Sequence, residues 1–346
     1  MFTRISTKYK FASILLCGML STHALAKTSF ELSNVTIEPG KMNSYFAKRG
    51  AVELPVTVIQ GQHSGPVLLL TAGIHGDEFP AMFALQRLKN DIDTSELKGT
   101  VIIVHLANLA GFHGRRIALS PKDEKNLNRE FPGKLDGTHT QQVAAFLTDE
   151  FISRADFLID MHSGRTSGTL LPHVYSPFVG DEKLDKLTFE FAKATGMKHI
   201  VMYGERPRDP NNSISYPNTA MTRGKPGLTT EIGHLGQRKE EDILADLDVV
   251  FNAMKFLKML PGSAKENPAP EIYNSLTAIA SPADGFFTAS AKVGDKVEKG
   301  ETVARITDYF GEPIATLKAP VSGIVLMINQ SPPIKKGESP VTIAVK

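Results

Sequence analysis

The sequence predicts an α/β fold in which a mixed, mostly parallel sheet is flanked by helices, followed by a small all-β barrel-sandwich domain. Between residues 53 and 261, apolar or β-branched runs alternate with stretches of helical spacing, which is typical of a sheet covered by helices on both faces. A segment rich in Pro and Gly at 261–270 then precedes a tail of short β-prone runs. The 346 residues exceed one ordinary core and favour a main domain with a smaller one.

The individual elements follow from the period of the apolar residues. Short apolar or β-branched runs predict strands, and apolar residues at helical spacing predict helices. The expected strands are 54–60, 67–71, 100–106 and 156–161, and the expected helices are 81–89, 141–153, 183–195 and 240–259. These elements place a main domain at 27–262, a linker at 263–272 and the all-β domain at 273–346.

Residues 1–26 are predicted to be a secretory signal peptide. Three basic residues precede an apolar run at 11–20, and Ala24-Leu25-Ala26 supplies the small residues of a cleavage site. The apolar run is too short to span a bilayer as a mature helix. We therefore expect a periplasmic or secreted mature protein; an uncleaved membrane anchor is the alternative.

The overall charge disfavours nucleic acid and anionic membranes as binding partners. The chain has 39 Lys and Arg residues against 37 Asp and Glu residues, and three of the basic residues lie within 1–26, which leaves 36 against 37. A mature chain near neutrality has no strong field for nucleic acid or an anionic membrane. We expect no nucleic-acid partner and, after signal cleavage, no membrane partner.

The first candidate site is the segment Thr71-Ala72-Gly73-Ile74-His75-Gly76-Asp77-Glu78, which follows a buried apolar run. The two glycines indicate a strand that stops abruptly before a helix, at the edge of the sheet where α/β proteins bind their ligands. There His75 and Glu78 could hold one metal ion from the same side. His-x-x-Glu alone is common, and a capped turn is the simpler alternative.

Two further strand ends complete this set. The run 156–162 ends in His162, and the run 227–231 ends in Glu231. A catalytic zinc keeps three protein ligands and an open position for water, whose proton a nearby Glu can accept. Asp160 lies on the same strand face as His162 and could orient one of the histidines; a purely structural hydrogen bond is equally consistent with the sequence.

A long loop at 108–133 carries several arginines. Guanidinium groups bind carboxylates in a bidentate geometry, so arginines beside a zinc site indicate a substrate with a free carboxylate. One of Arg115 and Arg116 could instead polarise the scissile carbonyl. We assign that role to Arg116 and substrate binding to Arg115, although their spacing does not separate the two and a solvated surface pair is the alternative.

These motifs carry a resemblance to a known family. The segments 73–78, 126–133 (Asn-Leu-Asn-Arg-Glu-Phe-Pro-Gly), 160–164 and 230–233 resemble the succinylglutamate desuccinylase and aspartoacylase family, a branch of the zinc carboxypeptidase fold. The resemblance spans roughly residues 50 to 260. It implies that the zinc ligands are His75, Glu78 and His162 and that the general base is Glu231. It also implies that Asn128 and Arg129 hold the substrate carboxylate.

The tail contains an internal repeat. Ser281-Pro282-Ala283-Asp284-Gly285 precedes Lys299-Gly300-Glu301, and Ala319-Pro320-Val321-Ser322-Gly323 precedes Lys336-Gly337-Glu338. Two such units predict a small barrel of quasi-twofold symmetry and resemble the biotinyl and lipoyl carrier fold. The turn between the halves has no Met-Lys-Met, so no lysine is placed for a cofactor. We expect a structural module that shapes the site entrance or contacts another copy in a homo-oligomer.

Together these features predict a zinc-dependent amidohydrolase or deacylase with one Zn²⁺ per chain, acting on linear amides. The expected substrate is a small N-acyl amino acid or short peptide with a free carboxylate. One alternative is a periplasmic metallocarboxypeptidase or amidase acting on cell-wall or other peptides. Another is a non-catalytic protein that binds a metal or carboxylate ligand, which Glu231 disfavours because binding needs no general base. An adaptor of an export assembly rests on the tail alone and ranks last.

Overall fold

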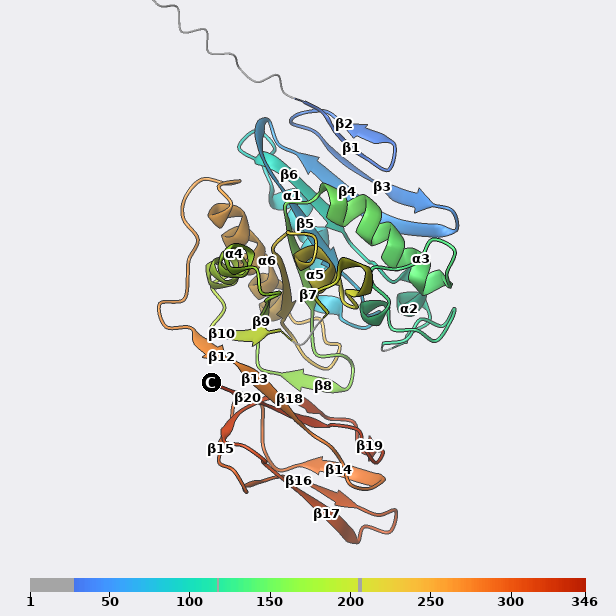
Figure 1. Cartoon of the computed structure of the whole chain (residues 1–346), viewed down its shortest axis with the longest axis vertical. Helices are drawn as coiled ribbons and strands as arrows, with labels where there is room; N and C mark the ends of the chain where they lie inside the picture. The colour runs from blue at the N-terminus through green and yellow to red at the C-terminus, as the bar shows by residue number, and fades with distance from the viewer. Residues whose placement is uncertain (1–27, 117, 205–206) are drawn as a thin grey trace, which may run out of the picture.

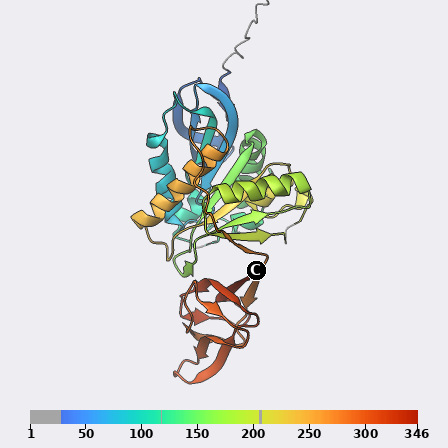
Figure 2. The same ribbon diagram turned by 90° about the vertical axis from the view of Figure 1, so that its left-hand side faces the viewer.

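The computed structural model describes residues 28–116, 118–204 and 207–346. The predicted signal peptide at 1–26 lies outside the described residues. Within them, no helix is both long and apolar enough to cross a membrane. The chain forms a large α/β region with a separate group of strands at one end (Figures 1 and 2).

One large mixed sheet dominates the α/β region. In order across the sheet its strands are β12 (Glu271–Tyr273), β10 (His199–Tyr203), β9 (His173–Pro177), β11 (Gly227–Glu231), β7 (Phe157–His162), β5 (His63–Ala72), β6 (Lys98–Val104), β4 (Val52–Gln60) and β3 (Met42–Arg49). The predicted strands at 54–60, 67–71, 100–106 and 156–161 are confirmed as β4, β5, β6 and β7.

The centre of this sheet is parallel. Strand β5 pairs in parallel with β6 and β7, and β7 pairs in parallel with β11. Antiparallel pairs occur between β9 and β11 and where β4 and β3 extend the sheet beyond β6. The prediction of a mixed, mostly parallel sheet is confirmed, and the carboxyl ends of β5, β7 and β11 meet at one edge.

Helices cover both faces of the sheet. They are α1 (Phe79–Asp91), α2 (Leu109–His113), α3 (His139–Phe146), α4 (Glu182–Ala194), α5 (Tyr216–Met221) and α6 (Glu240–Phe256), with short turns η1 (Leu127–Arg129), η2 (Leu147–Phe151), η3 (Ile152–Arg154) and η4 (Pro210–Asn212). The four predicted helices correspond to α1, to α3 with η2 and η3, to α4 and to α6.

The alternation of side chains along β5 explains this layering. Leu68 and Leu70 point into a core shared with α1, α4 and α6, whereas Leu69 points into a second core shared with α3 and α5. The β1–β2 hairpin (Phe30–Leu32 and Val35–Ile37) closes the second core with Leu32 and Ile37. A strand that is buried on both faces has apolar residues at successive positions. This burial explains the continuous apolar run before Gly73.

The C-terminal module, residues 275–346, consists of antiparallel strands. They are β13 (Ser275–Ile279), β14 (Gly285–Ala289), β15 (Lys296–Val297), β16 (Thr302–Thr307), β17 (Pro313–Lys318), β18 (Gly323–Asn329), β19 (Pro333–Ile334) and β20 (Val341–Val345). One sheet has the order β13-β20-β18-β15, the other β17-β16-β14-β19, and Val303, Val325 and Ile343 are buried in their common core. The all-β character is confirmed; the resemblance to carrier domains stays a prediction.

Backbone pairing joins the module to the α/β region. Strand β8 (Gly168–Leu170) pairs with β18 in an antiparallel ladder, and Leu171 N donates to Leu326 O at 2.8 Å. Figure 1 shows β8 reaching from the α/β region to the strands of the module. The strand that precedes the module, β12, belongs to the large sheet and pairs with β10. The module is therefore fixed to the segment that follows His162 in the chain.

Candidate active site

The turn between β5 and α1 carries the first two predicted ligands. Strand β5 ends at Ala72, and Gly73 adopts φ +73°, where a Cβ would lie 2.3 Å from Leu106 Cδ1. Only glycine tolerates both this φ and this close approach. Helix α1 begins immediately after Glu78, with Pro80 in its first turn, so His75 and Glu78 are held within one short turn.

The other two predicted residues lie at neighbouring strand ends. His162 is the last residue of β7, and Glu231 is the last residue of β11. Parallel pairing aligns both ends with the end of β5, because Ala72 pairs with Met161 and Glu231 pairs with His162. The sheet thus brings together all four residues that the sequence motifs had singled out.

Glu78 lies between the two histidines. His75 Nδ1 is 2.8 Å from Glu78 Oε1, and His162 Nδ1 is 2.7 Å from Glu78 Oε2. All three residues are buried, with side-chain exposures of 7% or less. The three ligand atoms lie within 4.8 Å of one another, so His75, Glu78 and His162 form a group that could hold a metal ion.

Each histidine is oriented through its second ring nitrogen. His162 Nε2 is 2.8 Å from Asp160 Oδ2, and His75 Nε2 is 3.3 Å from Asn126 Oδ1. Metal-bound histidines usually donate this second nitrogen to a carboxylate or carbonyl, which fixes the ring and leaves the other nitrogen as a ligand. The predicted contact of Asp160 with a site histidine is confirmed, whereas Asn126 had not been assigned this role.

The electrostatics of the group suit a divalent cation. Burial alone would raise the pKa of Glu78, but the two adjacent histidines hold that pKa well below its usual range. Burial opposes a charge on His162, yet Asp160 and Glu78 raise its pKa well above the ordinary value. Two buried carboxylates therefore call for nearby positive charge, which an ion bound to neutral imidazoles supplies.

The donor set also fits zinc in its chemistry. Two imidazoles and one carboxylate are the protein ligands of several catalytic zinc sites, where a fourth position stays open. Glu78 Oε2 has no partner in hydrogen-bond geometry despite its short distance to His162 Nδ1. Glu78 Oε1 is hydrogen-bonded to His75 Nδ1, whereas the buried Oε2 is left without an aligned partner and is available to an ion. The residues present fit a zinc ion.

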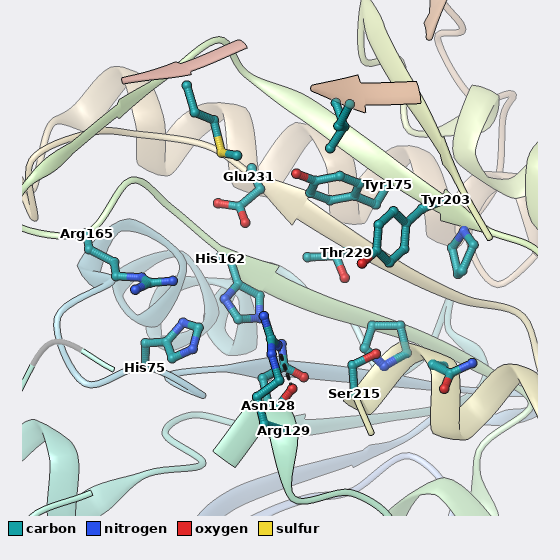
Figure 3. A pocket seen from close by; sticks show the side chains of 15 residues that line it. His75, Asn128, Arg129, His162, Arg165, Tyr175, Tyr203, Ser215, Thr229 and Glu231 are labelled. Atoms are coloured by element: carbon teal, nitrogen blue, oxygen red, sulfur yellow. Dashed lines mark hydrogen bonds between the residues drawn. The ribbon is translucent and has the colours of Figure 1, made fainter. Parts of the chain in front are cut away.

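Glu231 occupies the wall of a cavity beside this group. Burial raises the pKa of Glu231 to about 8, against the lowering effect of the nearby His162. The cavity has a volume of about 280 Å³, and its lining includes His75, His162, Tyr175 and Tyr203 (Figure 3). Figure 3 shows the Glu231 carboxylate on the same side of the cavity as the Tyr175 hydroxyl.

The Asn-Leu-Asn-Arg motif places two further predicted residues in this cavity. Turn η1 carries Asn128 and Arg129, which both line it. Asn128 Oδ1 accepts a hydrogen bond from Tyr216 N at 2.9 Å, and Arg129 Nη1 donates to Asn128 O at 2.7 Å. The lining also includes Leu276 and Met327 from the C-terminal module. Asn128 and Arg129 thus lie together at one wall of the cavity.

Arg115 and Arg116 are placed differently from the prediction. The Arg116 guanidinium forms an ion pair with Glu124 of the same loop and is 44% exposed. Neither arginine is among the residues that line the two cavities beside the metal-ligand group. In this structure Glu124 therefore holds the Arg116 guanidinium on the loop surface, outside both cavities.

Sequence reasoning missed Arg165. Its Nε lies 3.7 Å from Glu78 Oε1, and its side chain lines the cavity opposite Tyr203 (Figure 3). The neighbouring Thr166 anchors this segment, because its N and Oγ1 donate to Asp77 Oδ2 at 2.8 and 2.9 Å. The only indication of Arg165 in the sequence is its position three residues after His162, the histidine at the end of β7.

Comparison with known protein families shows to which family this chain belongs. Residues 64–257, more than half of the chain, match the succinylglutamate desuccinylase/aspartoacylase catalytic domain. The chain belongs to the succinylglutamate desuccinylase/aspartoacylase family. This membership confirms the resemblance drawn from the sequence motifs. Residues 280–345 match a second family model, described as an uncharacterized protein conserved in archaea.

Relatives within the family are similar over most of the chain. It is 31% identical over 275 residues to the N-alpha-acetyl-L-2,4-diaminobutyric acid deacetylase of Halomonas elongata, a match that covers 78% of each protein. The product-bound ectoine utilization protein EutE (DoeB) of Ruegeria pomeroyi superposes with a TM-score of 0.79 at 26% identity. A succinylglutamate desuccinylase/aspartoacylase of Rhodobacter sphaeroides gives 0.78 at 26% identity. Both superpositions cover 88% of this chain and 95% of the other.

Proposed function

We propose that the protein is a zinc-dependent amidohydrolase that removes the acyl group from a small N-acyl amino acid. The observation that carries this proposal is the buried group of His75, Glu78 and His162 with Glu231 at the next strand end. Glu231 is a carboxylate beside the predicted metal ligands but not one of them. Metal-assisted hydrolysis requires such a carboxylate as a base, whereas metal storage does not require one.

The residues divide the reaction between them. Zinc bound at this group would lower the pKa of a bound water to about 7 and polarise the substrate carbonyl. Glu231 accepts the proton from the attacking water and delivers it to the leaving amine nitrogen. Asp160 and Asn126 keep the two imidazole rings oriented with Nδ1 toward Glu78, so that both Nδ1 atoms would be available to the metal.

The cavity favours a substrate with a free carboxylate. Arg129 supplies a guanidinium next to Asn128, and such a fork binds a carboxylate through two parallel hydrogen bonds. The deacetylase of Halomonas elongata is named for an N-acetylated amino acid, which supports the same substrate class. The α-carboxylate of the leaving amino acid is therefore the group that we assign to Arg129.

We propose further that the protein acts outside the cytoplasm. The support is the signal-like segment at residues 1–26, with its Ala24-Leu25-Ala26 cleavage site. An exported enzyme would meet N-acyl amino acids or short peptides in the periplasm or the medium. Mass spectrometry of the protein recovered from the periplasmic fraction would test this, because cleavage predicts a mature N-terminus at Lys27.

The experiment for the main proposal combines metal content with turnover. The purified mature protein is expected to bind about one zinc per chain and to hydrolyse members of a panel of N-acyl amino acids. The variants His75→Ala and His162→Ala should lose both zinc and activity while they remain folded, and the exposed His63→Ala serves as the control. Bound zinc without turnover of any panel member would favour the non-catalytic alternative; no zinc in the parent would overturn the proposal.

A further inference from the structure

A second cavity opens from the same metal-ligand group. Its volume is about 290 Å³, and it shares His75, Arg165, Glu231 and Met327 with the first cavity. From this shared point the first cavity extends toward Arg129 and Tyr203, whereas the second extends toward Thr342 in the C-terminal module. The candidate reaction centre therefore lies where two cavities meet.

The second cavity is a seam between the two parts of the chain. One wall is the segment 163–170, which follows His162, and the other comes from β18, β20 and the turn at Ser339. The β8–β18 ladder holds these walls together, and Gln330 Nε2 adds a hydrogen bond to Thr169 Oγ1 at 3.0 Å. Because backbone pairing fixes its walls, the cavity is part of the fold.

The chemistry of the walls is that of neutral hydrogen bonding. Side chains with hydroxyl or amide groups line the cavity, namely Ser163, Ser167, Thr169, Asn329, Ser339 and Thr342. Ser163 is only 3% exposed, and its Oγ has no hydrogen-bond partner. A buried hydroxyl without a partner is costly, and it marks a place where a bound group would complete a hydrogen bond.

The charged side chains that line the second cavity gather at the metal-ligand group. The acidic residues that line the second cavity are Glu78 and Glu231, which belong to the metal-ligand group and the predicted base. The cation of the lining is Arg165, which lies beside Glu78 and also lines the first cavity. With no further carboxylate to pair with an ammonium group, the far end of the cavity suits an uncharged chain.

The second cavity is larger than an acetyl group requires. A volume of about 290 Å³ equals that of roughly ten water molecules at about 30 Å³ each, whereas an acetyl group has three heavy atoms. If Arg129 holds the carboxylate of the leaving amino acid in the first cavity, the scissile amide lies at the shared point. The acyl group must then enter the second cavity.

We propose that this seam is an acyl subsite for uncharged, amide-bearing acyl groups, so that the substrates are short N-blocked peptides with a free terminal carboxylate. The proposal rests on the proposed hydrolase function and names its substrate class. The hydroxyl groups of both walls donate to and accept from the peptide groups of the acyl chain. The C-terminal module thereby supplies part of the substrate-binding surface directly.

The test compares two acyl groups on one amino acid. The zinc-loaded full-length mature protein is assayed with the N-acetyl and N-acetylglycyl derivatives of the amino acid that it releases fastest. Thr342→Tyr fills the cavity from β20, and Ser339→Tyr fills it from an exposed turn that tolerates substitution. Thr316→Tyr, on the exposed face of β17, is the matched control.

The readout is the ratio of kcat/KM for the longer acyl group to that for acetyl. We expect the parent ratio to exceed 1, either filling variant to lower it at least tenfold, and Thr316→Tyr to leave it unchanged. A parent ratio below 1, or ratios that neither filling variant lowers, would overturn the subsite while the hydrolase function stands. Hydrolysis of neither derivative, nor of any N-acyl amino acid, would overturn the proposed function itself.

Discussion

Glu231 and His162 are direct partners in the parallel ladder between β11 and β7, and Ile232 N donates to His162 O at 3.0 Å. Backbone hydrogen bonds therefore set the position of the predicted base relative to a predicted metal ligand. A side-chain substitution at either position leaves this backbone register intact. The chemistry of each residue can thus be altered separately.

The variant Glu231→Gln is expected to keep its zinc and lose most of its turnover. Glutamine preserves the volume of the side chain but cannot accept the proton of the attacking water, and general base catalysis contributes about 10²- to 10⁴-fold. Zinc content and kcat on the best N-acyl amino acid check this together. The exposed Glu240→Gln is the control, and a kcat within about threefold of the parent for Glu231→Gln would remove Glu231 as the base.

The variant Asp160→Asn is expected to weaken zinc binding about 10- to 100-fold without removing a ligand. Asp160 is fully buried and fixes His162 Nε2 at 2.8 Å, so its charge favours the tautomer that leaves Nδ1 free for the ion. Competition with a chelator of known affinity measures the change. Asp156→Asn, just before the same strand, should bind zinc like the parent, and equal affinity for both variants would contradict the orienting role.

The variant Arg129→Met is expected to lose its preference for a free carboxylate. The parent should hydrolyse an N-acyl amino acid about 10- to 100-fold better than the corresponding C-terminal amide, since a hydrogen bond to a charged group contributes about 1.5–3 kcal/mol. The variant should show nearly equal kcat/KM for the two substrates. If the parent does not discriminate between them, Arg129 does not bind the substrate carboxylate.

The variant Asp246→Asn is expected to stabilise the protein above about pH 4. Asp246 on α6 is fully buried, and neither carboxylate oxygen has a hydrogen-bond partner. Burial first, and then the charge of Asp242, raise the pKa of Asp246 well above its ordinary value. The folded state then keeps the proton longer than the unfolded state, so the parent loses stability as pH rises from the unfolded pKa toward the folded one.

Urea unfolding at pH 4 and pH 8 measures this difference. The free energies of unfolding of parent and variant should be similar at pH 4, and the variant should gain roughly 1 kcal/mol or more at pH 8. The exposed Asp248→Asn on the same helix is the control and should follow the parent. Parallel curves for parent and Asp246→Asn would show that Asp246 titrates normally.

Much of the site could be predicted because its residues stand at strand ends. An apolar run that stops at glycine marks the edge of a buried sheet, and His75, Glu78, His162 and Glu231 all follow such runs. Parallel pairing then brings His75 and Glu231, which are 156 positions apart, to one edge. The sequence motif around Asn128 and Arg129 likewise identified two residues of the cavity.

The rest depends on contacts that have no local signal. Arg116 and Arg165 both follow glycine-containing segments, and only tertiary structure shows that Glu124 holds the first while the second approaches Glu78. Strand β8 has three residues, too few for a recognisable period, and it exists because β18 pairs with it. The second cavity depends on that pairing and could not be read from the sequence.

The β8–β18 ladder limits how the two parts of the chain can be exchanged between relatives. Three of the residues that line the second cavity, Gly168, Thr169 and Leu170, form one strand of a ladder whose other strand belongs to the C-terminal module. A chimera that takes the module from another family member would present a foreign β18 to a native β8. Selection must therefore act on both strands together, and substitutions in them should covary.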